Sequence, residues 1–248
     1  MKGVVLAGGL GTRLSPLTNI TNKHLLPVYN EPMIYFPLRT LVSAGIQDIL
    51  LVTGGHHAGD FLRLLRNGEA FGRLMLNYAY QVGEGGIADA LRLAEPFADG
   101  EPICVILGDN IIEKPIGHIV DRVRQQPDGA HIILKEVHDP SRFGVPVFEN
   151  GKVDGRIIRI EEKPANPASN YAVIGIYFYD ASVFDRIKTL KPSGRGELEI
   201  TDLNNSYLAE GKLHHSILDG WWTDAGTFES LRTASNLVAE SLEAKAAR

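Results

Sequence analysis

Short apolar runs alternate with amphipathic segments along the first half of the chain. The apolar runs are rich in Val, Ile, Leu and aromatic residues, which favours β-strands. Strands are predicted at Gly3–Leu6, Asp48–Val52, Leu74–Tyr80 and Ile103–Leu107. Helices are predicted over a segment with Pro32 in its first turn that ends near Ala44-Gly45, and over Ala58–Arg66, Ile87–Ala94 and Ile116–Gln125. This alternation indicates right-handed βαβ units and a mainly parallel sheet.

After about residue 130 the pattern changes towards strands. Strands are predicted at His131–Glu136, Val145–Glu149, Ile157–Glu161 and Val173–Tyr179, and helices at Ser182–Thr189, Leu198–Glu210 and Phe228–Ala244. The predicted fold class is therefore α/β. We expect one domain over residues 1–248, with a mixed, mainly parallel central sheet that is flanked by helices and carries a small β subdomain.

Composition narrows the class of protein. The net charge of −5 and the pI of 5.9 argue against a general nucleic-acid or membrane-surface binder. The only cysteine, Cys104, lies in an apolar run and is expected to be a buried, inert thiol. Glycines interrupt the apolar amino terminus, and no run approaches the ~20 apolar residues that span a bilayer. We expect a cytoplasmic protein with neither nucleic acid nor membrane as a partner.

A glycine-rich segment, Leu6-Ala7-Gly8-Gly9-Leu10-Gly11-Thr12-Arg13-Leu14, follows the first predicted strand directly. Glycines let backbone N–H groups approach an anion, and ligands of such sheets bind at the carboxyl ends of strands. The segment lacks the third glycine of a dinucleotide-binding fingerprint and the Gly-Lys-Ser/Thr of a P-loop. On the glycines alone, a phosphate-binding loop and a tight turn are equally good interpretations.

The distribution of charge favours the phosphate-binding interpretation. Residues 1–30 contain Lys2, Arg13 and Lys23 but no acidic residue, and the first carboxylate is Glu31. In an acidic chain, such a region suits a polyphosphate. Arg13 can bind phosphate oxygens in a bidentate manner, and Lys23 can act as a point charge.

Further motifs follow along nearly the whole chain. They are Asn22-Lys23-His24-Leu25-Leu26-Pro27, Pro32-Met33-Ile34-Tyr35, Gly85-Gly86-Ile87-Ala88-Asp89-Ala90, Leu107-Gly108-Asp109-Asn110, Glu161-Glu162-Lys163-Pro164, Arg195-Gly196-Glu197-Leu198-Glu199-Ile200-Thr201-Asp202 and Trp221-Trp222-Thr223-Asp224-Ala225-Gly226-Thr227. In this order, and with the glycine-rich segment, they resemble the sugar-1-phosphate nucleotidyltransferase family. Within that family the chain is most similar to the shorter members that use dTTP and glucose 1-phosphate.

The resemblance implies a Mg²⁺-dependent enzyme that joins dTMP to glucose 1-phosphate and assembles as a homo-oligomer. The implied catalytic residues are Arg13, Lys23, Asp109, Lys163, Arg195 and Asp224, of which Asp109 and Asp224 hold the metal. The implied nucleotide-binding residues are Leu6, Ala7, Gly8, Gly9, Gly11, Thr12, Arg13, Lys23, Gln81 and Gly86. The implied sugar-binding residues are Asp109, Asn110, Gly144, Glu162, Lys163 and Val173. Residues 1–130 would form the nucleotide-binding half, 131–227 the sugar-binding half, and 228–248 a C-terminal helix.

The chemistry is compatible with these residue types. A sugar-phosphate oxygen would attack the α-phosphorus, and it is already anionic because the second pKa of a phosphate monoester is about 6. No general base is required. What the reaction requires is alignment and suppression of the repulsion between two polyanions. Arg13 and Lys23 would draw charge onto the leaving pyrophosphate, and Lys163 and Arg195 would orient the attacking phosphate.

The two aspartates each have a structural alternative. Asp109 follows an apolar run, so it is expected at the carboxyl end of a strand, where an Asp-Asn turn would also fit. Asp224 would fit a helix cap. Thr227 is better placed to cap the helix that starts near Phe228, which leaves Asp224 free.

The sequence also predicts the environments of Lys163, Gln81 and the two tryptophans. Pro164 biases Lys163 towards an extended backbone, and an ion pair with Glu161 or Glu162 is the alternative to a phosphate contact. Gln81 carries a donor and an acceptor that match the N–H and carbonyl of thymine or uracil. Trp221 and Trp222 are expected to divide between the core and a pocket wall.

The chain also departs from the family pattern. His24 stands where longer members usually have glutamine, Gly85 replaces a common glutamate, and Gly144–Val147 lacks a glutamate often found there. Two other functions remain open: a uridylyltransferase, since one methyl group separates thymine from uracil, and a non-catalytic sensor of nucleotide sugars. A nicotinamide dehydrogenase is disfavoured by the missing third glycine.

Overall fold

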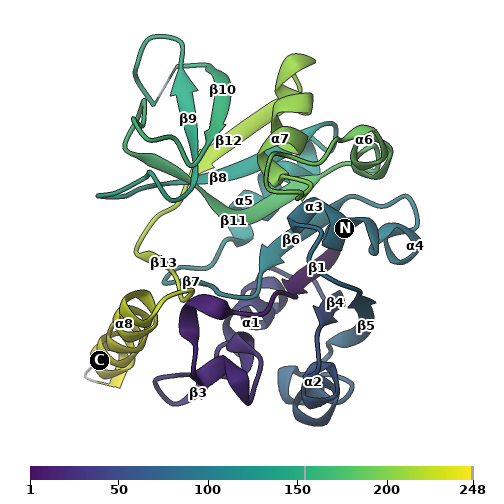
Figure 1. Ribbon diagram of the computed structural model, residues 1–248, viewed down its shortest axis with the longest axis vertical. Coiled ribbons are helices and arrows are strands. Elements are labelled where there is room, and N and C mark those ends of the chain that lie inside the picture. Colours follow the sequence, from purple (N-terminus) through teal and green to yellow (C-terminus); the bar gives the residue numbers. More distant parts are fainter. Residues whose placement is uncertain (154, 247–248) are drawn as a thin grey trace.

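The computed structural model describes residues 1–153 and 155–246 as an α/β protein (Figure 1). The strands are β1 (Lys2–Ala7), β2 (Pro27–Val28), β3 (Glu31–Pro32), β4 (Asp48–Gly54), β5 (Met75–Gln81), β6 (Ile103–Leu107), β7 (Asn110–Ile112), β8 (Ala130–Glu136), β9 (Gly144–Phe148), β10 (Ile157–Glu162), β11 (Tyr171–Tyr179), β12 (Leu213–Ile217) and β13 (Trp222–Asp224). The helices are α1 (Tyr35–Ser43), α2 (Ala58–Leu65), α3 (Ile87–Arg92), α4 (Glu95–Ala98), α5 (Gly117–Gln125), α6 (Val183–Thr189), α7 (Ile200–Ala209) and α8 (Phe228–Ala246).

In the described part of the chain, one nine-stranded sheet forms the centre of the fold. Strands β5, β4, β1 and β6 are consecutive neighbours and run parallel. Strand β11 then pairs antiparallel with β6, and it also joins β8 and β9. Strand β10 extends the sheet beyond β9, and β12 runs parallel to β8 at another edge. The predicted mixed α/β sheet is confirmed, and the predicted β subdomain is continuous with the main sheet.

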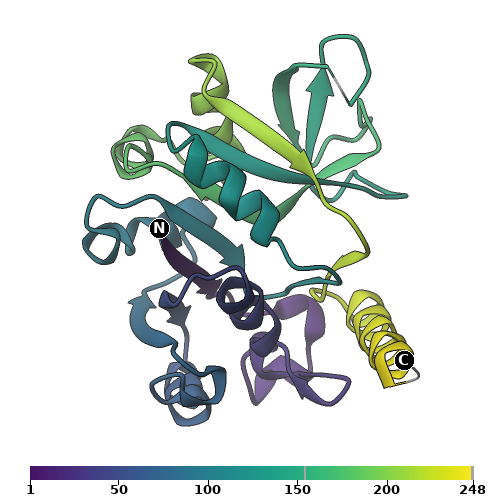
Figure 2. The same cartoon turned by 180° about the vertical axis from the view of Figure 1, so that it is seen from behind.

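Helices cover both faces of this sheet. On one face, α3, α6 and α7 pack against residues such as Val4, Val105 and Tyr179. On the other face, α1, α2 and α5 pack against residues such as Val5 and Ile106, and Figure 2 shows α5 and α1 from this side. Alternate residues of β1 enter opposite cores, as the period of two in a strand requires.

A third, smaller core lies beside the main sheet. Strands β7 and β13 form a two-stranded antiparallel ribbon, and β2 and β3 form a second one. Helix α8 packs against both ribbons through Ala234 and Val238, and Ala225 and Met33 face it there. The last helix therefore holds in place the β7–β13 ribbon, which carries Asp224.

Some predicted boundaries are wrong. Pro32 lies in β3, where it pairs with Pro27 of β2. The following helix therefore begins only at Tyr35. Strand β12 is missing from the prediction, since its His-His pair conceals the apolar pattern. The prediction for Cys104 holds: it is completely buried, and burial raises the pKa of its thiol. None of the described helices is both long and apolar enough to cross a bilayer.

Candidate active site

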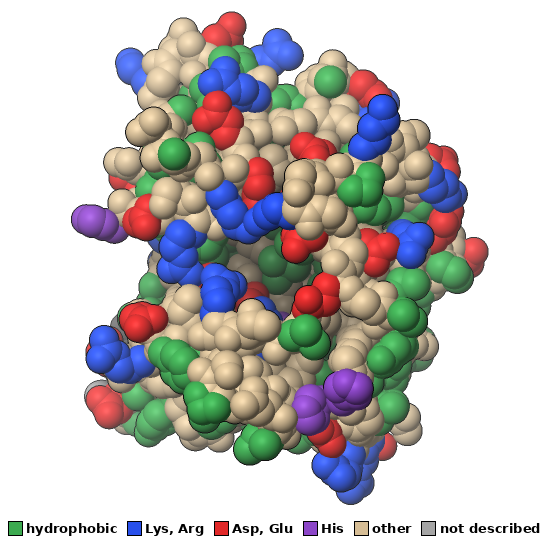
Figure 3. Space-filling view, in the orientation of Figure 1, with side chains coloured by type: hydrophobic (Ala, Val, Ile, Leu, Met, Phe, Trp, Pro, Cys, Tyr) green, Lys and Arg blue, Asp and Glu red, His purple; other side chains and the backbone are tan. Residues whose placement is uncertain are grey.

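A cleft of about 490 Å³ opens at the carboxyl ends of β1 and β6. Its walls come from both halves of the chain: the glycine-rich loop and β5 on one side, and β10, β11 and α7 on the other. Figure 3 shows this hollow, with basic side chains gathered on both sides of it. The predicted residues on its walls are Leu6, Gly8, Gly9, Thr12, Arg13, Lys23, Gln81, Gly86, Asp109, Asn110, Gly144, Glu162, Lys163, Val173 and Asp224.

The glycine-rich loop turns sharply after β1. Gly9 and Gly11 have φ angles of 88° and 65°, which only glycine adopts without strain. Gly11 precedes a 3₁₀ turn over Thr12–Leu14, and the buried Leu14 anchors this turn while Arg13 remains on the cleft wall. The predicted loop of close backbone turns is thus present at the end of the first strand.

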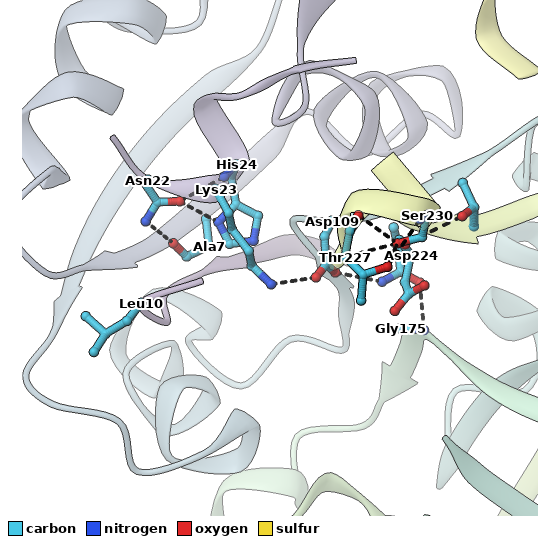
Figure 4. A network of polar contacts seen from close by, with 12 residues as sticks. Ala7, Leu10, Asn22, Lys23, His24, Asp109, Gly175, Asp224, Thr227 and Ser230 are labelled. Carbon is cyan, nitrogen blue, oxygen red and sulfur yellow. Dashed lines mark hydrogen bonds and ion pairs between the residues drawn. The ribbon is translucent and has the colours of Figure 1, made fainter. Parts of the chain in front are cut away.

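Lys23 and Asp109 meet in the cleft. Lys23 Nζ lies 2.6 Å from Asp109 Oδ2, and Asn110 Nδ2 donates to the other carboxylate oxygen over 3.1 Å (Figure 4). Burial acts to raise the pKa of Asp109, but the charge of Lys23, the neighbouring His24 and the hydrogen bonds from Lys23 and Asn110 together outweigh burial and hold the pKa well below its ordinary value. Asp109 follows β6 and Lys23 follows the glycine-rich loop, so the parallel pairing of β1 with β6 brings the two together.

Asn22 fixes the segment that carries Lys23. Its side chain accepts from the backbone N–H of His24 over 2.9 Å and contacts His24 Nδ1 at 2.8 Å, and its Nδ2 donates to Ala7 O over 3.4 Å (Figure 4). Burial, together with the charge of Lys23, lowers the pKa of His24 to about 3. The neutral ring then donates from Nδ1 to Asn22. An Asn before a short helical turn is an N-cap signal that the sequence reading overlooked.

The β7–β13 ribbon sets Asp224 beside Asp109. Asp224 pairs in register with Asn110, and the N–H of Ala225 donates to Asp109 O over 2.8 Å. Thr227 Oγ1 accepts from the N–H of Ser230 over 3.2 Å, so the predicted cap by Thr227 is confirmed. Burial and the neighbouring Asp109 raise the pKa of Asp224 to about 6.

The two carboxylates and Arg13 converge on a glycine. A Cβ atom at Gly226 would lie 3.0 Å from Arg13 Nη2, 3.5 Å from Asp224 Oδ2 and 3.6 Å from Asp109 Oδ2. Within the described residues no group of three or more His, Cys, Asp or Glu side chains is arranged so that it could hold a metal ion. Two carboxylates that share an open cleft fit a hard divalent cation such as Mg²⁺, which takes few protein ligands and completes its shell with water and phosphate.

The side of the cleft formed by β10, β11 and α7 is organised around Glu162. Its carboxylate accepts from Thr201 Oγ1 over 2.6 Å and lies 3.3 Å from Arg195 Nη2 and 3.4 Å from Lys163 Nζ. The alternative ion pair of Lys163 with Glu162 is therefore present. Arg195 does not reach the cleft wall, because both oxygens of Glu199 accept from its guanidinium over 2.8 and 2.9 Å.

The extended backbone expected at Lys163 is wrong. Its φ is 47°, and its N–H donates to Phe143 O over 3.0 Å, which continues the β9–β10 pairing. The chain leaves the sheet at this residue, and Pro164 excludes the right-handed helical alternative. A left-handed conformation for a non-glycine residue stores strain, which is typical of functional sites.

Sequence reasoning missed several cleft residues. Arg142 Nη2 lies 3.5 Å from Asp224 Oδ2, and its guanidinium lies over the ring of Phe143. Trp222 forms part of the cleft wall while Trp221 packs on α8, as expected for a division between pocket and core. Two predicted nucleotide-binding residues, Ala7 and Gly11, do not line the cleft, and Ala7 is completely buried. Arg142 had no sequence signal, since its partner lies 82 residues away.

Together, the sheet, the glycine-rich loop and the convergent cations and carboxylates define an enzyme that handles phosphorylated substrates. A family model described as nucleotidyl transferase matches residues 2–241. Glucose-1-phosphate thymidylyltransferase from Xanthomonas campestris is 46% identical over 96% of this chain and 80% of its own. The enzyme of the same name from Neisseria meningitidis is 45% identical over 96% and 82%.

A solved structure from Bacillus anthracis agrees with these relatives. It is described as a candidate glucose-1-phosphate thymidylyltransferase in complex with sucrose, is 51% identical, covers 96% of this chain and 94% of its own, and has a TM-score of 0.90. A UDP-glucose pyrophosphorylase is 24% identical with a TM-score of 0.84, covers 96% of this chain and 98% of its own, and shares the fold. The chain belongs to the nucleotidyl transferase family, whose enzymes generally depend on a divalent metal.

Proposed function

We propose that the chain transfers dTMP from dTTP to glucose 1-phosphate, which gives dTDP-glucose and pyrophosphate. The convergence of Arg13, Lys23, Asp109 and Asp224 in one cleft carries the proposal. Relatives that are 44–46% identical over 96% of the chain and bear the name of this activity support it.

The reaction needs no general base, because the attacking phosphate oxygen is already anionic. An oxygen of the sugar phosphate forms a bond to the α-phosphorus, and the bond between that phosphorus and the pyrophosphate oxygen breaks. Arg13, Lys23 and the loop of Gly8, Gly9, Gly11 and Thr12 bind the triphosphate and accept the charge that moves onto pyrophosphate. Mg²⁺, held by Asp109 and Asp224, would supply polarisation of the phosphate oxygens.

The sugar phosphate occupies the other side of the cleft in this proposal. Lys163 orients the attacking phosphate, and Arg195 joins it once its guanidinium leaves Glu199, while Glu162 accepts hydrogen bonds from hexose hydroxyls. Asn110, Gly144 and Val173 shape the sugar pocket. The halves are thus assigned to the nucleotide over residues 1–130 and to the sugar over 131–227, with the C-terminal helix from residue 228.

A substrate panel tests the function. The protein with dTTP, glucose 1-phosphate and Mg²⁺ is expected to release pyrophosphate, and a chelator of divalent metals should abolish this release. A higher kcat/KM for UTP than for dTTP would identify a uridylyltransferase instead. Binding of nucleotide sugars without turnover of any nucleoside triphosphate, across several sugar 1-phosphates, would identify a sensor.

We also propose a homo-oligomer, on the strength of the family resemblance. Sedimentation equilibrium at micromolar concentration should give a mass that is a multiple of 27.1 kDa. A mass of one chain at all concentrations would refute this part of the proposal without affecting the activity.

A further inference from the structure

Gln81 ends β5 at the nucleotide end of the cleft and has only 6% of its surface exposed. Its Nε2 donates to Asp89 Oδ2 over 3.0 Å and lies 3.5 Å from Gly86 O. Asp89 belongs to α3 and stands behind Gln81, away from the cleft wall. Both neighbours of the amide nitrogen are therefore parts of the protein.

These neighbours fix the direction of the amide. A carboxylate and a backbone carbonyl only accept hydrogen bonds, so the NH₂ group of Gln81 must face them and Oε1 must face away. Oε1 points towards the glycine-rich loop, since a Cβ atom at Gly8 would lie 2.7 Å from it. Both amide hydrogens have protein acceptors. The cleft therefore receives an acceptor from Gln81 and no donor.

Asp89 is itself held in place. Arg92 Nε lies 2.9 Å from Asp89 Oδ1, which leaves Oδ2 for Gln81. A Cβ atom at Gly85 would lie 2.5 Å from Asp89 Oδ2, so the carboxylate occupies room that only glycine leaves there. This contact explains why glycine stands at position 85, where a glutamate is common in the family: a larger residue would displace the Asp89 carboxylate from Gln81.

We propose that Asp89 is a positioning residue that restricts Gln81 to accepting, so that the site takes bases with a ring N–H at this position. The proposal rests on the function above. Thymine and uracil carry N3–H and are accepted. The ring N3 of cytosine is itself an acceptor, so it would face Oε1 without a proton between them and is rejected.

The test compares dTTP with dCTP, both with glucose 1-phosphate, in Asp89→Asn and the unmodified enzyme. The Asn amide can donate as well as accept, so Gln81 gains a flipped orientation that presents Nε2 to the base. We expect the ratio of kcat/KM for dTTP to that for dCTP to fall by about tenfold, the effect of one net hydrogen bond. The change in this ratio should come from the KM values, while kcat for dTTP stays nearly unchanged.

Asp60→Asn is the matched control, because Asp60 also pairs with an arginine three residues on, on exposed α2. It should leave the ratio unchanged. Gln81→Leu should lower the ratio at least as far as Asp89→Asn does. The double variant should match Gln81→Leu alone, since Asp89 acts through Gln81. If Asp89→Asn does not fold, Asp89→Ser, whose hydroxyl also donates and accepts, takes its place.

The outcomes separate the two proposals. Absence of turnover by the unmodified enzyme with every pyrimidine nucleotide refutes the proposed function. Turnover of dTTP with an unchanged ratio in folded Asp89→Asn, or an equal loss with both nucleotides, refutes the role of Asp89. An additive effect in the double variant refutes the route through Gln81.

Discussion

The two sides of the cleft treat their cations differently. We call the two sides, by the substrates proposed for them, the nucleotide side and the sugar side. On the nucleotide side, Arg13 makes no ion pair with any residue in the described part of the chain, and Lys23 has a single partner, Asp109. On the sugar side, Lys163 pairs with Glu162, and Arg195 lies within 3.9 Å of Glu162, Glu197 and Glu199. The nucleotide side thus keeps Arg13 without a carboxylate ion-pair partner, whereas both cations of the sugar side are paired.

This difference suits the two substrates. A triphosphate carries more charge than a monoester, and it gains most where cations lack carboxylate partners. The side whose cations are paired attracts a second triphosphate less, and its carboxylates supply acceptors for sugar hydroxyls. A cation without a carboxylate partner on one side and paired cations on the other would therefore sort two phosphorylated substrates.

The largest expected effect follows from removing the carboxylate that both sides share. Asp109→Asn should lower kcat by about a thousandfold, because a metal ligand is lost while the shape stays. Its effect on Tm should be small by comparison, since Asn still accepts from Lys23. Steady-state kinetics and thermal melts measure the two, with Asp60→Asn as control. Activity near that of the unmodified enzyme would remove Asp109 from the metal site.

The sequence predicted the elements that local patterns determine. Strand β6 was predicted residue for residue, and Asp109 was expected at its end, because an apolar run followed by Gly-Asp fixes both. Thr227 was identified as a cap for the same local reason. Contacts between distant segments were not predictable: the approach of Arg142 to Asp224 depends on the register of β7 with β13.

Lys163 marks a different limit of sequence reading. The following proline favours an extended backbone at Lys163, but it does not exclude the left-handed conformation. Pairing of β10 with β9 makes that choice, and it is a tertiary contact. Arg195 shows a similar limit, because three neighbouring carboxylates, those of Glu162, Glu197 and Glu199, decide where its guanidinium lies.

A pair of substitutions tests whether the sides divide the substrates. Lys23→Ala should lower kcat/KM about a hundredfold when dTTP is varied and change KM for glucose 1-phosphate by less than about threefold. Lys163→Ala should show the reverse pattern. Initial rates over a grid of both substrates supply the four constants. Equal losses for both substrates in either variant would contradict the division.

The next effect comes from the point where Arg13 and both aspartates converge. Gly226→Ala places a Cβ atom 3.0 Å from Arg13 Nη2, so the guanidinium must move. We expect kcat to fall about thirtyfold with little change in stability, because the backbone at Gly226 accommodates alanine. Gly117→Ala is the matched control, since its Cβ meets nothing within 4 Å. Unchanged kcat in Gly226→Ala would show that this convergence is not used.

The smallest effect concerns the hydrogen bond that aims Glu162 on the sugar side. Thr201→Val removes the donor 2.6 Å from Glu162 Oε2 and keeps the shape of the buried side chain. Glu162 then turns more freely towards Arg195 and Lys163, so KM for glucose 1-phosphate should rise about fivefold, within the range for a hydrogen bond to a charged group.

The nucleotide side provides the matched variant for this last comparison. Glu84 accepts from the N–H of Leu10 over 2.8 Å, and Glu84→Gln keeps an acceptor there, so KM for dTTP should stay within about twofold. Thr201→Val should leave KM for dTTP unchanged as well, because Glu162 belongs to the sugar side. A rise in KM for dTTP in Thr201→Val, as large as the rise for glucose 1-phosphate, would mean that Glu162 positions both substrates and that the two sides do not act separately.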